Sequence, residues 1–421
     1  MKRWQIWWTD PAKLMLFVTM PVVLLSAAIG GPVMHTYGAL NFITPWILLL
    51  CALSIGSLAA GSWIGDTMAL GSKERGQFDP ARVEIAIIAL AAASILAHLI
   101  YLGAALAKPT VLLAAMTGQR GAIYAVKAGI TKIPGVTSLT QMYMLAVPLY
   151  AAFEGLFGRK PGKSVRTVVN TLFAMIVLRA FVGLERFALI EVAICYAIPK
   201  LSFTKKRLDG RLAFLPLFGF FALVILFAIG EFMRAWAYYK NAYSNFGEFV
   251  WARLLGYLAT ATNNGAGVFQ TSGPMGGPFF TAAWVRKLPI WGPNGPPFGD
   301  PETMRNFFER YATSEFNNPG GVMTGYLDYG VVGGILLFIF TGFLGGLIYG
   351  SFQRRRPLGV LLFPTMYTGF LVITQAYYWG DPRAFTVWMV SPFVLWYITR
   401  RSISSWRQAR QQRQTETFQP G

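Results

Sequence analysis

Cysteine and histidine are scarce in this chain of 421 residues, which contains two of each. Cys51 and Cys195 lie inside apolar runs, so the sequence offers no framework of extracellular disulfides and no thiol metal site. His35 and His98 stand in no spacing that resembles a zinc or iron site. These absences disfavour a metalloenzyme, and we expect no cofactor.

Charge is sparse as well. Charged residues make up 13% of the chain and hydrophobic residues 54%, whereas an average soluble protein is about 25% charged. The sequence also lacks a Walker loop, a dinucleotide-binding fingerprint and the residue order of a serine hydrolase. ATP-driven transport and serine hydrolysis are therefore unsupported.

Long apolar runs are abundant, and they are long enough to cross a hydrocarbon core of about 30 Å. No small-residue cleavage site follows the first of them, so we expect it to be retained as a span. The pattern predicts an all-α, polytopic membrane protein with about ten transmembrane helices. We place these helices at 14–33, 42–64, 83–106, 137–157, 165–181, 184–199, 212–233, 331–352, 358–378 and 384–399.

Acidic residues are half as frequent as basic ones, 18 against 37, which gives a net charge of +19. Lys and Arg in short loops stay on the cytoplasmic side, and one alternation of the helices collects 23 of the basic residues on that side. Both termini are then cytoplasmic. Topology and anionic lipids explain most of the excess charge, so we expect membrane lipids, and no nucleic acid, as partners. The clusters lie at 2–13, 73–82, 159–166, 200–211, 354–356 and 400–413.

Two long segments fall on the opposite side. Residues 107–135 carry four basic residues and no acidic one, which indicates either an anion-binding surface or a long loop that crosses regardless of its charge. Residues 234–330 are too long for a passive connector. They begin with helix-like sequence at 236–258, continue through a Gly/Pro-rich stretch at 263–301, and end in a polar helical piece at 302–314.

This reading divides the chain into four parts. Residues 1–233 hold seven transmembrane helices, 234–330 form a large, partly helical periplasmic loop subdomain, 331–400 hold three more helices, and 401–421 form a cytoplasmic tail.

The stretch from Val165 to Pro199 carries unusual charges. Its roughly 35 residues are too few for two full spans and a turn, so the turn, expected at Gly183, lies near membrane depth. An ionisable group there costs about 2.5 kcal/mol or more unless it is paired or wet. In one interpretation the charges pair internally, Arg186 with Glu185 or Glu191, while Arg179 extends to the interface. In the other, the two guanidiniums bind a phosphate or pyrophosphate.

Further candidates lie in the large loop and the last external turn. The aromatic and amide-rich segment of Arg253, Tyr257, Asn263 and Asn264 suits sugar rings, although Trp and Tyr also populate membrane interfaces for physical reasons alone. Arg310 lies on a helix with Arg305 and Glu309, where an exposed ion-pair face is the plain alternative.

Three further residues stand near the ends of helices. Asp328 stands where the next helix enters the membrane, as an N-cap or as a functional carboxylate. Glu315 precedes an Asn-Asn-Pro-Gly-Gly turn, and Arg383 either belongs to a structural turn or joins the anion site.

The chain resembles bacterial O-antigen polymerases, the Wzy-like oligosaccharide repeat-unit polymerases. The likeness covers most of the chain, through its helix count and late external loop, and is carried by Leu178-Arg179…Glu185-Arg186-Phe-Ala-Leu-Ile-Glu191, Arg253…Tyr257…Asn263-Asn264, and Glu315-Phe-Asn-Asn…Asp328-Tyr-Gly330…Gly333. It implies an enzyme of the bacterial inner membrane that transfers a glycan from undecaprenyl pyrophosphate to an acceptor sugar hydroxyl at the periplasmic face. It also implies a chain-length regulator as a candidate partner. The arginines implied to hold the pyrophosphate are Arg179, Arg186, Arg253 and Arg310.

The resemblance leads us to expect metal-independent glycosyl transfer in which arginines neutralise the departing pyrophosphate. Glu185, Glu315 and Asp328 are the candidates for a catalytic base. Two rivals stay open. O-antigen ligases share the architecture but commonly carry a histidine in the large loop, where this chain has none. A flippase or exporter would bind the same lipid-linked glycan without chemistry.

Overall fold

The structure is a computed structural model that describes residues 6–71, 78–117, 119, 121–130, 133, 135–183, 185–203, 210–287, 290, 301–313 and 316–400. All regular secondary structure in these ranges is helical. Each of the ten apolar runs contains a helix, so the prediction of an all-α fold is confirmed. Glu315 lies outside the described residues.

The first half of the chain forms the helices η1 (Trp7–Thr9), α1 (Pro11–Leu14), η2 (Met15–Thr19), α2 (Met20–Thr36), α3 (Pro45–Gly71), α4 (Pro80–Leu106), α5 (Pro109–Met116), α6 (Ala122–Gly129), α7 (Val136–Leu139), η3 (Thr140–Met142), α8 (Tyr143–Phe157), α9 (Lys163–Gly183) and α10 (Arg186–Phe203). The second half forms η4 (Gly210–Phe214), α11 (Leu215–Glu231), η5 (Phe232–Trp236), α12 (Ala237–Tyr239), α13 (Phe246–Ser272), η6 (Val285–Lys287), α14 (Pro301–Tyr311), α15 (Gly321–Gln353), α16 (Pro357–Val372), η8 (Tyr378–Gly380) and α17 (Pro382–Thr399).

Seven helical segments in the described residues are long and apolar enough to cross a membrane. The predicted number was ten. Of the three other apolar runs, α10 carries three charged residues in 18 positions and α16 is only 16 residues long. The seven segments establish a polytopic membrane protein, and they are Pro11–Thr36, Pro45–Ala69, Pro80–Gly103, Val136–Phe157, Lys163–Gly183, Leu212–Tyr239 and Gly321–Gln353.

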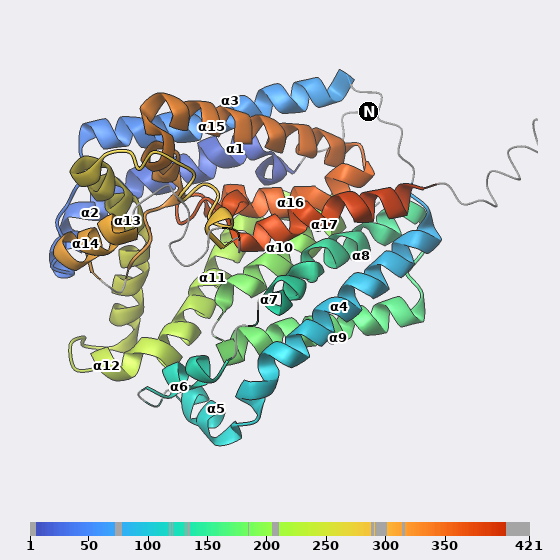
Figure 1. The fold of residues 1–421 in the computed structure, drawn as a ribbon, viewed down its shortest axis with the longest axis horizontal. Helices are drawn as coiled ribbons and strands as arrows, with labels where there is room; N and C mark the ends of the chain where they lie inside the picture. Colours follow the sequence, from blue (N-terminus) through green and yellow to red (C-terminus); the bar gives the residue numbers. More distant parts are fainter. Residues whose placement is uncertain are drawn as a thin grey trace, which may run out of the picture.

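Glycines bring α3 and α15 into close contact along their length (Figure 1). A Cβ added to Gly342 would lie 2.3 Å from the carbonyl oxygen of Leu58, and one added to Gly346 would lie 2.0 Å from that of Ser62. A larger residue at either position forces the two backbones apart. Small residues at such positions let two helix backbones approach closely.

The segments that carry the basic clusters meet at one end of the bundle. The indoles of Trp7 and Trp8 donate to the carbonyls of Ala213 and Leu212, and the amide of Asp79 donates to the carbonyl of Ile398. At the opposite end lie α5, α6 and α12 to α14 (Figure 1). The chain thus separates its basic short connections from its two long segments.

Helix α13 is longer than expected and runs across that opposite end (Figure 1). We expected a Gly/Pro-rich stretch to begin at Asn263, but the helix continues to Ser272. The reason is close contact: a Cβ on Gly265 would lie 2.1 Å from the carbonyl oxygen of Pro319, and one on Gly267 would lie 2.4 Å from the Phe307 ring. These glycines therefore serve packing within a helix, where we had expected them to break one.

Helix α15 also begins earlier than expected, at Gly321, and bends at Gly330, whose φ of 70° is left-handed. Asp328 consequently lies inside the helix, two residues before the bend at Gly330. The prediction that it caps the N-terminus of this helix is wrong, because the N-cap is Gly320.

Candidate anion-binding site beside the turn between α9 and α10

The turn between α9 and α10 lies where the sequence predicted it, since α9 ends at Gly183 and α10 begins at Arg186. The adjacent residues Glu185 and Arg186 join two different polar clusters. Glu185 belongs to a cluster with α4, α8, α10 and α17, and Arg186 belongs to one with α11 and α13.

We call the first group the Glu185 cluster, which consists of Tyr101, Tyr143, Arg179, Glu185, Glu191, Tyr378 and Arg383. Arg179 is 4% exposed and donates Nε and Nη2 to one oxygen of Glu185, at 2.9 and 2.5 Å. Its Nη1 donates to the Thr140 hydroxyl at 2.8 Å. The alternative in which Arg179 extends to the membrane interface is therefore wrong, because the buried Arg179 side chain is held by Glu185 and Thr140.

Arg383 closes the Glu185 cluster from α17. Its Nη2 lies 3.3 Å from Glu185 Oε2 and its Nη1 lies 3.4 Å from Glu191 Oε2. The hydroxyls of Tyr143 and Tyr378 both donate to the fully buried Glu191 at 2.6 Å. The Glu185 cluster has no net charge, because its two guanidiniums, Arg179 and Arg383, balance its two carboxylates, Glu185 and Glu191.

Glu185 lies in the turn between the two helices. Burial raises the pKa of its carboxyl, but the guanidiniums of Arg179 and Arg383 lower it by more, so this pKa lies below the usual value for glutamate. The group is a carboxylate at neutral pH, and its Oε1 accepts a hydrogen bond from the Tyr101 hydroxyl at 2.8 Å.

The second group has a different charge balance. We call it the Glu231 cluster, which consists of Arg186, Glu231, Arg234, Arg253 and Tyr257. Glu231 is fully buried at the end of α11. Arg186 and Arg234 both donate to its Oε1, at 3.2 and 2.6 Å, and Arg253 donates to its Oε2 at 3.2 Å. Within the described residues, three guanidiniums thus contact the Glu231 carboxylate. The proposed pairing of Arg186 with Glu185 or Glu191 is wrong, because Arg186 pairs with Glu231.

Two arginines of the Glu231 cluster keep part of their surface open. The Arg186 and Arg234 side chains are 25% and 24% exposed, whereas Arg253 is 4% exposed. Within the described part of the chain, Arg186 donates to Glu231 and to the Phe227 carbonyl, and Arg234 donates to Glu231 and to the Tyr257 hydroxyl. Each guanidinium has five N–H donors. Both therefore have donors left for an anionic ligand.

The backbone of α11 makes room for these arginines. A Cβ added to Gly230 would lie 2.8 Å from Arg186 Cδ and 3.1 Å from its Nε. The five residues that follow the end of α11, Phe232–Trp236, form a π-helical turn that carries Arg234. Such turns are frequent at functional sites. Aromatic rings cover the cations, since the Arg186 guanidinium lies 4.8 Å from the Phe227 ring centre and that of Arg253 lies 4.5 Å from the Phe316 ring centre.

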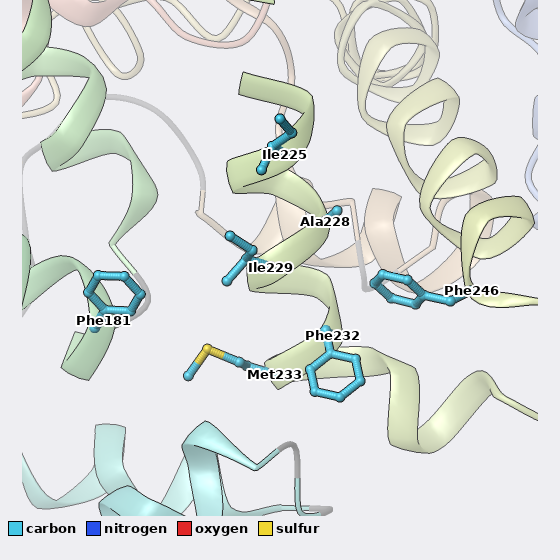
Figure 2. A pocket seen from close by; sticks show the side chains of 7 residues that line it. All are labelled: Phe181, Ile225, Ala228, Ile229, Phe232, Met233 and Phe246. Carbon is cyan, nitrogen blue, oxygen red and sulfur yellow. The ribbon is translucent and has the colours of Figure 1, made fainter. Parts of the chain in front are cut away.

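An apolar cavity of about 430 Å³ borders the same helix (Figure 2). Only apolar side chains line it, and Ile225, Ile229 and Phe232 of these are 61%, 44% and 41% exposed. Figure 2 shows Phe181 of α9 on one side of α11 and Phe246 of α13 on the other. The complete lining is Phe181, Ile225, Ala228, Ile229, Phe232, Met233 and Phe246.

The predicted amides do not face an open site. The Asn263 side chain accepts from the Phe42 amide at 2.7 Å and donates to the Leu40 carbonyl at 2.8 Å. Asn264 donates to the carbonyls of Phe316 and Asn318. Both are buried, and their hydrogen bonds fix connecting segments.

Asp328 has a similar structural setting. Its carboxylate accepts hydrogen bonds from the amides of Phe280 and Thr281 and from the Thr281 hydroxyl, at 2.7 to 3.1 Å. Arg310 is exposed on α14, and among the described residues Arg305 of the same helix forms the expected ion pairs, with Glu302 and Glu309. These contacts leave Arg186, Arg253 and Tyr257 as the predicted residues that the structure brings together in the Glu231 cluster.

Sequence reasoning missed Glu231 and Arg234. Both lie near the end of the predicted span 212–233, at a spacing of three residues in Gly-Glu-Phe-Met-Arg. The cost of placing ionisable groups at membrane depth applies here as it does in the α9–α10 turn. That cost is the sequence signal that could have identified Glu231 and Arg234 as candidates.

Comparison of the chain with known proteins found no matching family model, no matching curated protein and no matching solved structure.

Proposed function

We propose that the protein is a polymerase of lipid-linked oligosaccharide repeat units in a bacterial inner membrane. It transfers a glycan from an isoprenoid diphosphate carrier to the sugar hydroxyl of an acceptor, without a metal ion. The observation that supports the proposal is the convergence of Arg186, Arg234 and Arg253 on the buried carboxylate of Glu231, with Arg186 and Arg234 partly exposed.

The chemistry of this cluster suits a diphosphate leaving group. Guanidiniums present planar forks of donors that match phosphate oxygens. Transfer of the glycan breaks the bond between the anomeric carbon and the diphosphate, which leaves with the bonding electrons, and the acceptor oxygen forms the new bond to that carbon. Arginines that neutralise the growing negative charge on the diphosphate lower the barrier.

The proton of the acceptor hydroxyl needs a base, and Glu185 is the proposed one. The Glu185 carboxyl is ionised, and Glu185 directly precedes Arg186. The arginines Arg179 and Arg383 hold its carboxylate in one position. Asp328 is less suited, because the 280–281 backbone already occupies its oxygens.

The test is the substitution Arg186→Ala. This change removes one partly exposed guanidinium from the Glu231 cluster. We therefore expect lipid-linked single repeat units to accumulate in cells without polymer. We also expect the rate of elongation to fall at least about 100-fold, which corresponds to a barrier raised by roughly 2.7 kcal/mol. Thin-layer and gel analysis of the lipid-linked glycans measures both effects. Arg305→Ala, which removes an exposed arginine of α14, is the matched control and keeps the parental rate.

Polymer of normal length from a well-expressed Arg186→Ala variant contradicts the proposal. Purified protein in vesicles separates it from transport: elongation of lipid-linked repeat units without an energy source supports the polymerase, whereas translocation without elongation supports a flippase.

A further inference from the structure

Glu191 is a charged side chain that the structure buries completely. It lies on α10, six positions after Glu185, and has no exposed surface. The Tyr143 hydroxyl donates to its Oε2 and the Tyr378 hydroxyl donates to its Oε1, each at 2.6 Å. Burying a carboxylate costs free energy even when it is paired, and a neutral side chain at this position would avoid that cost. The transfer reaction proposed above gives Glu191 no role.

Arg383 divides its guanidinium between Glu191 and Glu185. Its Nη1 lies 3.4 Å from Glu191 Oε2, and its Nη2 lies 3.3 Å from Glu185 Oε2. A fully formed hydrogen bond between a guanidinium and a carboxylate is about 2.7–2.9 Å long, and Arg179 Nε reaches Glu185 at 2.9 Å. Arg383 therefore binds neither carboxylate as closely as Arg179 binds Glu185.

The surrounding side chains support Arg383 in this intermediate position. Its guanidinium carbon lies 5.6 Å from the centre of the Phe187 ring, on α10 between the two glutamates. The Phe187 ring packs edge-on against the Tyr378 ring, with 5.5 Å between the ring centres. The backbone amide of Arg383 donates to the side chain of Asp381, the N-cap of α17, at 2.8 Å. Tyr378 thus contacts both Glu191 and the ring that supports the arginine.

The division of Arg383 bears on the base strength of Glu185. A cation beside a carboxylate stabilises its charged form and so makes it a weaker base. Arg179 already donates two hydrogen bonds to Glu185, and a second guanidinium bound as closely would weaken the base further. The negative charge of Glu191 attracts Arg383 and limits this effect.

We propose that Glu191 is a positioning residue, which holds Arg383 back from full contact with Glu185 and so keeps Glu185 able to accept a proton from the acceptor hydroxyl. This inference rests on the proposed function, in which Glu185 is the base. In that step the O–H bond of the acceptor breaks, the proton binds to Glu185, and the electron pair of the oxygen forms the bond to the anomeric carbon. The proton then passes to water, because the Glu185 side chain is 20% exposed.

The experiment measures elongation by the purified full-length protein in nanodiscs. The substrate is the pool of lipid-linked single repeat units isolated from cells that carry the Arg186→Ala variant. In Glu191→Gln the charge at 191 is lost and Arg383 pairs fully with Glu185, so we expect kcat to fall at least about tenfold while KM stays within about twofold. Glu154→Gln, which alters an exposed carboxylate paired with Lys200, is the matched control and keeps the parental kcat.

A double variant tests whether Glu191 acts through Arg383. Adding Arg383→Gln to Glu191→Gln leaves Arg179 as the arginine that pairs with Glu185, and the cluster is again neutral. We expect this second substitution to raise kcat at least about threefold above that of Glu191→Gln. If Glu191→Gln does not fold, the charge-balanced double variant decides alone: a kcat within about threefold of the parental value supports the proposal, and a lower one overturns it.

Three results overturn the proposal and leave the proposed function intact, as long as Arg186→Ala still accumulates single repeat units. The first is a parental kcat in Glu191→Gln. The second is a loss that lies in KM. The third is a double variant that is no faster than Glu191→Gln, since a purely structural Glu191 loses more with each contact removed. If the parent protein translocates the isolated repeat units without elongating them, the proposed function is wrong and this inference is wrong with it.

Discussion

Gly230 determines how closely the Arg186 side chain packs against α11. Its missing side chain leaves the space that the Arg186 stem occupies against α11. In a helix, alanine is otherwise favoured over glycine by up to about 1 kcal/mol. We therefore infer that glycine occupies position 230 because it accommodates the Arg186 side chain.

We predict that Gly230→Ala lowers the elongation rate at least about tenfold while the melting temperature in detergent stays within a few degrees of the parent. The added Cβ displaces Arg186 from Glu231 and the Phe227 carbonyl, because it would lie 2.8 Å from Arg186 Cδ. Gly219→Ala is the matched control on the same helix, since no atom lies within 4 Å of its added Cβ. Equal elongation rates in the two variants would show that the position of Arg186 does not matter.

Residue partners were the hardest feature to predict. The sequence correctly placed a turn at Gly183 beside Arg179 and Glu185, because a stretch of that length cannot hold two full spans. It left the pairing open, since a partner such as Arg383 is 192 positions from Glu191. Only the folded bundle brings α10 and α17 together.

At the scale of elements, the segment 275–281 is attached to α15 near its bend. The amide of Met275 donates to the Leu327 carbonyl at 2.6 Å, and the Asp328 carboxylate receives the amides of Phe280 and Thr281. Helix α15 thus holds this part of the large loop through the Asp328 side chain and through backbone hydrogen bonds at Leu327 and Asp328.

We predict that Asp328→Asn destabilises this attachment by roughly 1–3 kcal/mol, because hydrogen bonds to a charged acceptor are worth more than those to an amide. Limited proteolysis is the measurement, and we expect faster cleavage within residues 273–287. Glu309→Gln is the control, since it alters a carboxylate that is 65% exposed on α14. Unchanged cleavage in Asp328→Asn would mean that the remaining contacts suffice.

Helix positions were well predicted wherever an apolar run was long, because hydrophobicity over about 20 residues is a strong local signal. The polar loop was predicted less well. Asn263 to Gly267 has the composition of a turn, yet it continues α13 because its small residues meet Pro319 and Phe307. Such tertiary contact overrides local propensity and is invisible in the segment itself.

At the scale of the whole molecule, the basic short connections and the long segments lie at opposite ends of the bundle. The positive-inside rule assigns the first to the cytoplasm. This assignment is a prediction that chemical labelling checks directly.

We predict opposite accessibility for Ser164→Cys, at the start of α9, and Ser244→Cys, just before α13. Both serines are exposed, and the natural Cys51 and Cys195 are fully buried. A membrane-impermeant maleimide is expected to label position 244 in spheroplasts and position 164 only after permeabilisation. The reverse pattern would place the Glu231 cluster nearer the cytoplasm and exclude periplasmic transfer.

The buried carboxylate among three arginines also bears on turnover. Glu231 is a resident counter-ion, so under the proposed function an arriving diphosphate would compete with it for the same guanidiniums. Such competition would weaken the binding of both the substrate and the spent carrier. Tight binding of the ground state does not by itself speed the chemical step. If the proposed function holds, a fixed carboxylate would therefore favour release of the carrier after each transfer, which a polymerase must repeat for every unit it adds.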